Sequence, residues 1–353
     1  MKHVCYFERV LDPALFEQQL TAGGDISLSR VDRDMSEQDL AEKLSAVHGY
    51  HTRGGTQLVP PRFRIDRDFL ARCPRLVAVC TGGAGYDAIN VGDCTEAGVL
   101  VANQAGLNAE AVAEHAFAMM LSLSKQLAQV NAALRRDPAL DRFAYRGNDI
   151  FGKTLGIVGL GHIGTRIAEV GATAFGMTVL AAHPRLTPEA AKRRHAHLVA
   201  LPELLSTSDF VVVACGLSDE TRGMFGASEF ARMKSTAYFI TIARGGIHDE
   251  SALGDALSAG TIAGAGLDVW MEEPPPHDHP LLGFDNVLAS PHIAAVTHES
   301  AHNASIGAAA QWREILNGKR PARLVNPAVW PRYAARFEAI MGFPVEQNGD
   351  NPT

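Results

Sequence analysis

Short runs of apolar residues alternate along this chain with longer stretches in which apolar positions recur at helical spacing. The short runs are rich in Val, Ile, Leu and Ala and indicate buried strands, which we expect at 75–80, 98–102, 177–181, 210–214, 237–242, 264–269 and 287–289. The longer stretches predict helices at 110–130, 165–175, 250–259 and 299–316. Strands that alternate with helices are typical of parallel sheets with crossover helices, so the pattern predicts an α/β fold.

A polar stretch at 131–150, which contains Pro138 and Gly147, interrupts this alternation. A second series of strands and helices begins near Lys153, and a chain of 353 residues is long enough for two domains. We therefore predict two domains and an exposed arm or connection at 131–150. Residues 331–353 become polar, and we expect them to form a partly loose C-terminal tail.

Composition restricts the partners that such a chain can have. Its formal net charge is −7, whereas binding to nucleic acid or to an anionic membrane needs a basic surface, so neither partner is expected. No apolar run reaches the roughly 20 residues of a membrane helix, and the charged N-terminal residues make a poor signal peptide. The 5 cysteines form no CxxC pair, which favours reduced, structural thiols in a cytoplasmic protein.

A glycine-rich turn follows the predicted strand Leu155–Val158 and precedes the predicted helix 165–175. Its glycines have the GxGxxG spacing of a dinucleotide-binding turn: Gly159 permits the tight turn, Gly161 lets the backbone approach a pyrophosphate, and Gly164 allows close packing of helix and strand. The helix N-terminus then offers unpaired N–H groups to the phosphates. We therefore predict a nicotinamide dinucleotide at this turn.

The residue that would bind the cofactor's ribose is unusual. In NAD-binding folds an acidic residue follows the next strand, about twenty positions further on, and hydrogen-bonds the ribose hydroxyls. Here His183 stands at that place, followed by Arg185. A carboxylate would repel a 2′-phosphate, whereas an arginine can bind it with two hydrogen bonds. We therefore favour NADP over NAD as the cofactor, with Arg185 as a solvated loop residue as the alternative.

Three ionisable residues each follow a predicted strand in the second half of the chain, namely Arg244, Glu273 and His292. Ligands of open α/β sheets bind where the strands end. An arginine can hold a carboxylate and polarise a neighbouring carbonyl, and a histidine exchanges protons near neutral pH. A carboxylate beside the imidazole orients it and favours its protonated form. The combination predicts reduction of a 2-oxo acid or oxidation of a 2-hydroxy acid.

Several stretches, in this order, support a family resemblance: TGGAGYDAIN (81–90), EAVAEHA (110–116), GKTLGIVGLGHIG (152–164), ARGGIHDE (243–250), GLDVWMEEP (266–274) and SPHIAAVT (290–297). They cover nearly the whole chain to about Asn326. In these stretches the sequence resembles the D-isomer-specific 2-hydroxyacid dehydrogenases, which include phosphoglycerate dehydrogenase and the glyoxylate/hydroxypyruvate reductases.

The resemblance implies a role for individual residues. Arg244 would bind substrate, Glu273 would pair with the imidazole, and His292 would donate and accept the proton. The turn Gly82, Gly83 and Ala84 would offer N–H groups to the substrate carboxylate. The residues expected to contact the cofactor are Gly159, Gly161, His162, Ile163, Gly164, His183, Arg185, Cys215, Gly216, Thr221, Ile242, Ala243 and Asp268. Among these, Asp268 would hold the nicotinamide carboxamide.

The resemblance also implies an architecture of two doubly wound parallel-sheet domains. Residues 1–103 and 299–330 would form a flavodoxin-like substrate-binding domain, and the Rossmann domain 104–298 would be inserted into it. Members of the family are usually homodimers, and we expect the 131–150 arm to contribute to the contact.

Other interpretations remain open at this point. The same Arg–Glu–His set serves phosphite oxidation, and a corepressor-like protein that senses dinucleotides could share the fold. Formate oxidation is disfavoured because Glu273 would repel a formate anion. The cluster His277, Asp278 and His279 lies in a proline-rich loop without a third ligand at helical spacing, so no metal site is expected.

Overall fold

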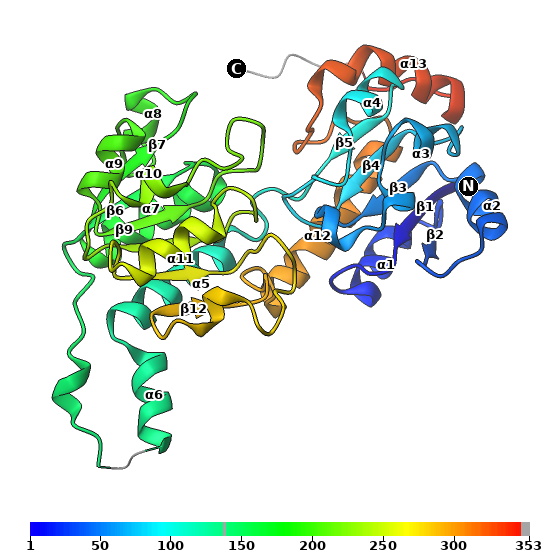
Figure 1. Cartoon of the computed structure of the whole chain (residues 1–353). Helices are drawn as coiled ribbons and strands as arrows, with labels where there is room; N and C mark the ends of the chain where they lie inside the picture. Colours follow the sequence, from blue (N-terminus) through cyan, green and yellow to red (C-terminus); the bar gives the residue numbers. More distant parts are fainter. Residues whose placement is uncertain (137–138, 347–353) are drawn as a thin grey trace. The chain divides into compact units, whose positions relative to one another are not determined.

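The computed structural model describes residues 1–136 and 139–346 (Figure 1). The chain divides into two compact units, Met1–Asn108 with Thr297–Thr353 and Ala109–Val296. Each unit is built on its own parallel sheet, as the pattern of strands and helices predicted. Among the described residues, no helix combines the length and the apolar character that crossing a membrane requires.

The sheet of unit 1 has the strand order β2-β1-β3-β4-β5, which is the flavodoxin-like order. Its strands are β1 (Lys2–Phe7), β2 (Ile26–Val31), β3 (Gly49–Thr52), β4 (Ala78–Thr81) and β5 (Leu100–Ala102). Its helices are α1 (Pro13–Thr21), α2 (Glu37–Ala46), α3 (Arg67–Ala71), α4 (Val91–Glu96), α12 (His298–Leu316) and α13 (Trp330–Met341). Short 3-10 helices complete it at Thr56–Leu58, Pro61–Phe63 and Pro327–Val329. Apolar clusters on both faces of the sheet form the core of this unit.

The sheet of unit 2 has the order β12-β11-β10-β9-β6-β7-β8, which is the Rossmann order extended by one strand. Its strands are β6 (Thr154–Val158), β7 (Thr178–Ala182), β8 (His197–Leu198), β9 (Phe210–Val213), β10 (Tyr238–Thr241), β11 (Gly264–Leu267) and β12 (Val287–Ala289). Its helices are α5 (Ala109–Ser124), α6 (Leu127–Arg136), α7 (His162–Phe175), α8 (Pro188–Lys192), α9 (Leu201–Thr207), α10 (Ala227–Phe230) and α11 (Glu250–Ser258), with 3-10 helices at Arg142–Tyr145 and Pro280–Gly283. The predicted fold class is thus confirmed.

The strands of unit 2 end level with one another. Val158 pairs with Val213, Val213 with Thr241, Thr241 with Leu267, and Leu267 with Ala289. Each of these residues is the last of its strand. The segments that follow β6, β9, β10, β11 and β12 therefore leave the sheet along one edge, where α/β folds bind their ligands.

Two expectations about helices need correction. The helix predicted over 110–130 is divided, because Gln126 adopts a left-handed conformation with φ of 52° between α5 and α6. The tail predicted to be loose from residue 331 begins instead with α13, which buries Tyr333 and Phe337 one helical turn apart in the core of unit 1. Residues 347–353 of that tail, and 137–138 of the predicted arm, lie outside the described residues.

The arm itself lies in unit 2. Figure 1 shows α6 and the segment from residue 139 to about 150 reaching away from the sheet of this unit. Consistent with this placement, α6 has no buried residue, and Leu134 on α6 and Phe143 beyond it are exposed. The expected exposed connection is therefore present.

A buried histidine predicts that the stability of unit 1 depends on pH. His51 on β3 is 3% exposed, and its Nδ1 accepts a hydrogen bond of 3.2 Å from the indole N–H of Trp312 on α12. Because the indole can only donate, the ring proton of the neutral imidazole lies on Nε2. Burial lowers the pKa of His51 from 6.5 to about 4, since the charged form loses its hydration.

We predict that replacing His51 by Asn reduces the loss of stability in mild acid. The folded-state pKa lies below the ordinary one, so the unfolded chain binds this proton more readily, and stability falls as the pH drops from about 6.5 to about 4. At pH 5 the effect is about 2 kcal/mol. Urea unfolding at pH 7.5 and pH 5 should therefore show a smaller loss for His51→Asn than for the wild type. The exposed His302, replaced by Asn, is the control, and equal losses in all three proteins would contradict the prediction.

Candidate active site

The glycine-rich turn after β6 has the conformation that a dinucleotide requires. Gly159 has φ of 97°, and a Cβ there would lie 2.7 Å from the backbone of Cys215. A Cβ on Gly164 would lie 2.1 Å from the carbonyl oxygen of Gly159, so only glycine permits this approach of helix and strand. Gly161 begins α7 without a side-chain cap, and no atom lies within 4 Å of its Cβ position. The open N-terminus of α7 therefore fits the pyrophosphate of a dinucleotide.

The residues predicted next to this turn lie in the adjoining segments. His162, which is exposed, and the half-buried Ile163 form the first turn of α7. After β9, the hydroxyl of Thr221 donates to the carbonyl of Gly216 over 2.8 Å, so these two residues are brought together. Burial raises the pKa of the Cys215 thiol, and the contact predicted between Cys215 and the cofactor stays a prediction.

Two arginines, Arg185 and Arg194, lie near the place where an acidic residue would bind the ribose. His183 follows β7, and its Nδ1 accepts a hydrogen bond of 3.2 Å from the backbone N–H of Arg185. The pKa of His183 is lowered by partial burial and by the charges of Arg194 and Arg185. Arg194 donates over 2.5 Å to the carbonyl of Leu160, inside the glycine-rich turn. The contact between Arg194 and the turn was not predicted, because nothing in the sequence indicates that the segment after α8 lies against the turn after β6.

Arg244, Glu273 and His292 follow the adjacent strands β10, β11 and β12. The Nδ1 atom of His292 lies 2.7 Å from Oε2 of Glu273. A carboxylate only accepts hydrogen bonds, so Nδ1 carries a proton and Nε2 is left to exchange one with another molecule. The glutamate side chain is 12% exposed and that of His292 34%, so the imidazole remains accessible while its partner is mostly buried.

The segment after β11, residues 268–273, contains Trp270 and connects Arg244 with the His292–Glu273 pair. A Cβ on Gly245, the residue after Arg244, would lie 1.9 Å from the carbonyl oxygen of Trp270. The backbone N–H of Trp270 donates over 3.2 Å to Oε1 of Glu273. Arg244 is half-buried and donates over 2.7 Å to the carbonyl of Ala243. The close approach of these two backbones places all three predicted residues around one segment.

Ile242 and Ala243, which lead from β10 to Arg244, are both 6% exposed and line the same edge of the sheet. Asp268 begins the segment after β11 and is fully buried. Its carboxylate accepts hydrogen bonds from Ser290, Ile293 and Ala294. The contact predicted between Asp268 and the nicotinamide carboxamide stays a prediction.

The predicted substrate turn Gly82–Ala84 belongs to unit 1, after β4. The N–H of Gly82 is already used, because it donates over 3.0 Å to the carbonyl of Thr52 in the sheet. The carbonyl of Gly83 accepts from the N–H of Gln104 over 2.8 Å. Within the described part of the chain, the N–H groups of Gly83 and Ala84 make no hydrogen bond. Only these two of the three predicted residues therefore offer their N–H groups to an anion.

The cluster in the proline-rich loop is used differently from a metal site. His279 lies 3.2 Å from Glu250 and packs edge-on against Trp270, whereas His277 and Asp278 are exposed. Within residues 1–136 and 139–346, no group of His, Cys, Asp and Glu side chains is suited to hold a metal ion.

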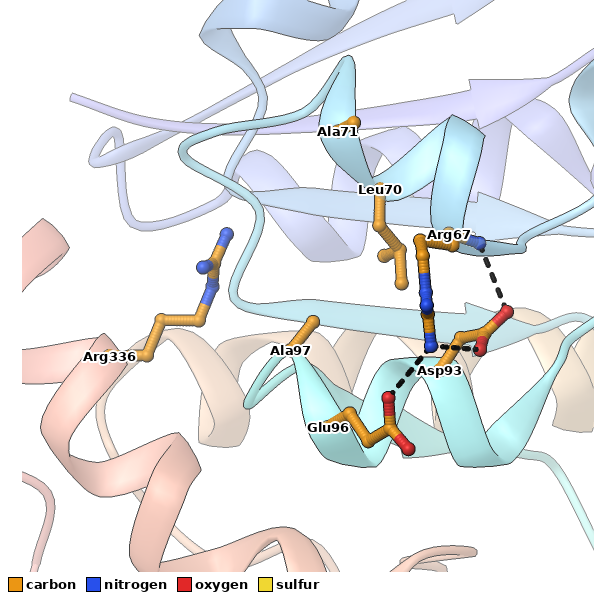
Figure 2. A pocket seen from close by; sticks show the side chains of 7 residues that line it. All are labelled: Arg67, Leu70, Ala71, Asp93, Glu96, Ala97 and Arg336. Atoms are coloured by element: carbon orange, nitrogen blue, oxygen red, sulfur yellow. Dashed lines mark hydrogen bonds and ion pairs between the residues drawn. The ribbon is translucent and has the colours of Figure 1, made fainter.

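A hollow of about 330 Å³ lies in unit 1 among α3, α4 and α13 (Figure 2). Its charged groups are already paired, since Arg67 contacts Glu96 over 3.0 Å and Arg336 donates over 2.7 Å to the carbonyl of Leu76. It includes none of the predicted site residues. We therefore do not assign chemistry to it.

Comparison with known proteins agrees with this geometry. Residues 117–294 match the family described as D-isomer specific 2-hydroxyacid dehydrogenase, NAD binding domain. The chain is 38% identical over 269 residues to glyoxylate/hydroxypyruvate reductase B of Pectobacterium carotovorum, which covers 75% of this chain and 84% of that protein. It is 34% identical over 318 residues to D-3-phosphoglycerate dehydrogenase of Methanocaldococcus jannaschii, covering 90% of this chain but only 59% of that longer protein.

Among solved structures, D-lactate dehydrogenase from Aquifex aeolicus, complexed with NAD and lactic acid, aligns with a TM-score of 0.78 at 25% identity. The alignment covers 92% of this chain and 99% of the other. The chain therefore belongs to the D-isomer specific 2-hydroxyacid dehydrogenases, oxidoreductases that use a nicotinamide dinucleotide.

Proposed function

We propose that this chain interconverts a small 2-oxo acid and the corresponding D-2-hydroxy acid, with Arg244 binding the substrate and the His292–Glu273 pair exchanging the proton. The observation that supports this proposal is the 2.7 Å contact between His292 Nδ1 and Glu273 Oε2. It fixes the tautomer of an accessible imidazole at the edge of the sheet where the cofactor turn also lies. An acid and a cation at such an edge are what reduction of a 2-oxo acid requires.

Each of the three residues would have a separate role in the reaction. The nicotinamide supplies the hydride to C2 of the oxo acid, or accepts it from the hydroxy acid. In the reductive direction His292 gives its Nε2 proton to the oxygen that was the ketone, and it regains a proton from water. Glu273 stabilises the positive charge of the imidazolium before that transfer. The guanidinium of Arg244 neutralises the substrate carboxylate and polarises the ketone.

We assign the substrate to the class of glyoxylate and hydroxypyruvate. Support comes from the relative named for these substrates, of which the chain covers 84%, whereas it spans only 59% of the phosphoglycerate dehydrogenase. The N–H groups of Gly83 and Ala84 are suited to a carboxylate, and we assign them to substrate binding as well. Phosphite oxidation and dinucleotide sensing without catalysis are separated from this proposal by the assay below.

We expect Arg244→Ala and His292→Ala each to lower kcat/KM for glyoxylate with NADPH by about a thousandfold, because proton transfer and charge stabilisation typically contribute factors of this size. Binding of NADPH, followed by its fluorescence, should change little. His277→Ala, which removes an exposed histidine from a neighbouring loop, is the control. Wild-type turnover in either variant would refute the assigned roles. If NADPH binds but no 2-oxo acid is turned over, reduction of NADP by phosphite would favour phosphite oxidation, and no reaction with phosphite would favour a sensing protein.

We further propose that the cofactor is NADP rather than NAD, because His183 stands where a carboxylate would be and Arg185 and Arg194 lie beside it. Replacing Arg185 by Ala should raise KM for NADPH about tenfold, as the loss of one charge-assisted contact with a phosphate implies. KM for NADH should stay within about twofold, since NADH has no 2′-phosphate. Steady-state kinetics of Arg185→Ala with NADPH and with NADH give the two KM values to compare, and NADH serves as the control. Equal changes in both KM values would reject a contact between Arg185 and the 2′-phosphate.

The arm beyond α5 supports a third proposal, a homodimer. Leu134 and Phe143 are 59% and 64% exposed, and α6 buries none of its residues, so the arm offers large apolar side chains that a second copy could cover. Light scattering should give about twice 37.8 kDa for the wild type. The double substitution Leu134→Asp and Phe143→Asp should give the monomer mass, whereas Leu282→Asp, outside the arm, should not. A monomeric wild type, or a dimer that survives both charges, would reject the arm as the interface.

A further inference from the structure

The buried carboxylate of Asp268 holds the segment that carries His292. Its Oδ1 accepts from the hydroxyl of Ser290 over 2.6 Å and from the N–H of Ile293 over 2.9 Å, and its Oδ2 accepts from the N–H of Ala294 over 3.0 Å. These donors lie on both sides of His292 in the sequence. One carboxylate therefore fixes the backbone before and after the proposed proton donor.

The hydrogen bonds of Asp268 stabilise a backbone conformation that is unfavourable for His292. Its φ is 56°, in the left-handed region that residues other than glycine seldom adopt. Such a conformation persists only when the surrounding contacts hold it. If the backbone at His292 relaxed, its ring would turn away from Glu273, and the 2.7 Å contact of the pair would be lost.

A second histidine completes the arrangement. His115 on α5 places its Nε2 atom 3.0 Å from Oγ of Ser290 and 3.6 Å from Oδ1 of Asp268. The hydroxyl proton of Ser290 is committed to Asp268, so its oxygen must accept from His115, and His115 must carry its proton on Nε2. The hydrogen bonds thus run in one direction, from His115 to Ser290 and from Ser290 to Asp268.

We propose that His115 is a positioning residue for the reaction. It orients the hydroxyl of Ser290 toward Asp268 and thereby keeps the His292 segment in the conformation that meets Glu273. This inference rests on the proposed role of His292 as proton donor. It assigns to His115 no contact with substrate or cofactor, and it gives Asp268 a role that its three hydrogen bonds already display.

The test compares His115→Phe, which removes the N–H donor at similar size, with His115→Gln, whose amide places an N–H donor near the position of Nε2. His115→Phe should lower kcat for glyoxylate roughly tenfold, since a small misplacement of a reacting group costs factors of ten to a hundred. KM for glyoxylate should stay within about twofold, because Arg244 is not part of this chain of hydrogen bonds. His115→Gln should restore most of kcat.

Ser290→Ala provides a second, smaller change that should have the same effect as His115→Phe. The double variant should be no worse than either single one, because both act through the same hydrogen bonds. Long-range proton–nitrogen NMR spectra add a readout that needs no turnover. They should show a protonated Nδ1 on His292 in the wild type and in His115→Gln, and loss or broadening of that signal in His115→Phe and Ser290→Ala.

The outcomes separate the two hypotheses. If the wild type reduces no 2-oxo acid, the proposed function fails, while the NMR comparison still decides whether His115 positions His292. If His115→Phe and Ser290→Ala lower only the thermal midpoint, with kcat and the His292 signal unchanged, His115 is merely structural and the inference is overturned. Additive losses in the double variant would also overturn it.

Discussion

The level ends of the parallel strands in unit 2 are the constraint on which the site depends. Hydrogen-bonded register places Val158, Val213, Thr241, Leu267 and Ala289 side by side as the last residues of their strands. Segments that are far apart in the sequence therefore leave the sheet at one edge. Strand pairing thus brings the cofactor turn near Arg244, Glu273 and His292, because each of them follows one of these strand ends.

Register alone does not fix side chains, and short contacts between backbones supply the remaining precision. Gly245 passes so close to the carbonyl of Trp270 that no side chain fits, and Trp270 in turn donates to Glu273. Its indole N–H donates over 2.9 Å to the carbonyl of Ser290, at the base of the His292 segment. A single buried tryptophan thus ties the segments after β10, β11 and β12 together, and this accounts for its burial beside a polar site.

Local patterns in the sequence were sufficient for six of the seven strands of unit 2 and for the glycine turn, because each depends on neighbours within a few positions. The two-residue strand β8 was missed because it is too short to form an apolar run. The positions of Arg244, Glu273 and His292 after their strands were predicted, and their roles stay predictions. The break at Gln126 was missed, since neither Lys125 nor Gln126 is a helix breaker. The helix around Tyr333 was missed because residues 331–353 were interpreted together as a polar tail, although the helical spacing of Tyr333, Phe337 and Met341 was visible. The hydrogen bonds of Asp268 could not be predicted, because their donors, the hydroxyl of Ser290 and the backbone N–H groups of Ile293 and Ala294, lie more than twenty positions away and carry no signature in the sequence.

Asp268 also explains how a strained histidine is compatible with a stable fold. A buried carboxylate is costly unless donors satisfy it, and here the donors are the backbone N–H groups that a left-handed residue at 292 brings into reach. Relaxing His292 would leave the charge of Asp268 short of partners, at a cost of about 1–3 kcal/mol for each donor lost. That cost is comparable to the strain of a left-handed residue, about 1–3 kcal/mol. Ile293 and Ala294 directly follow His292, so relaxation would affect both donors together, and their combined loss would outweigh the strain. The imidazole is thereby held against Glu273, in the geometry that we propose for proton transfer.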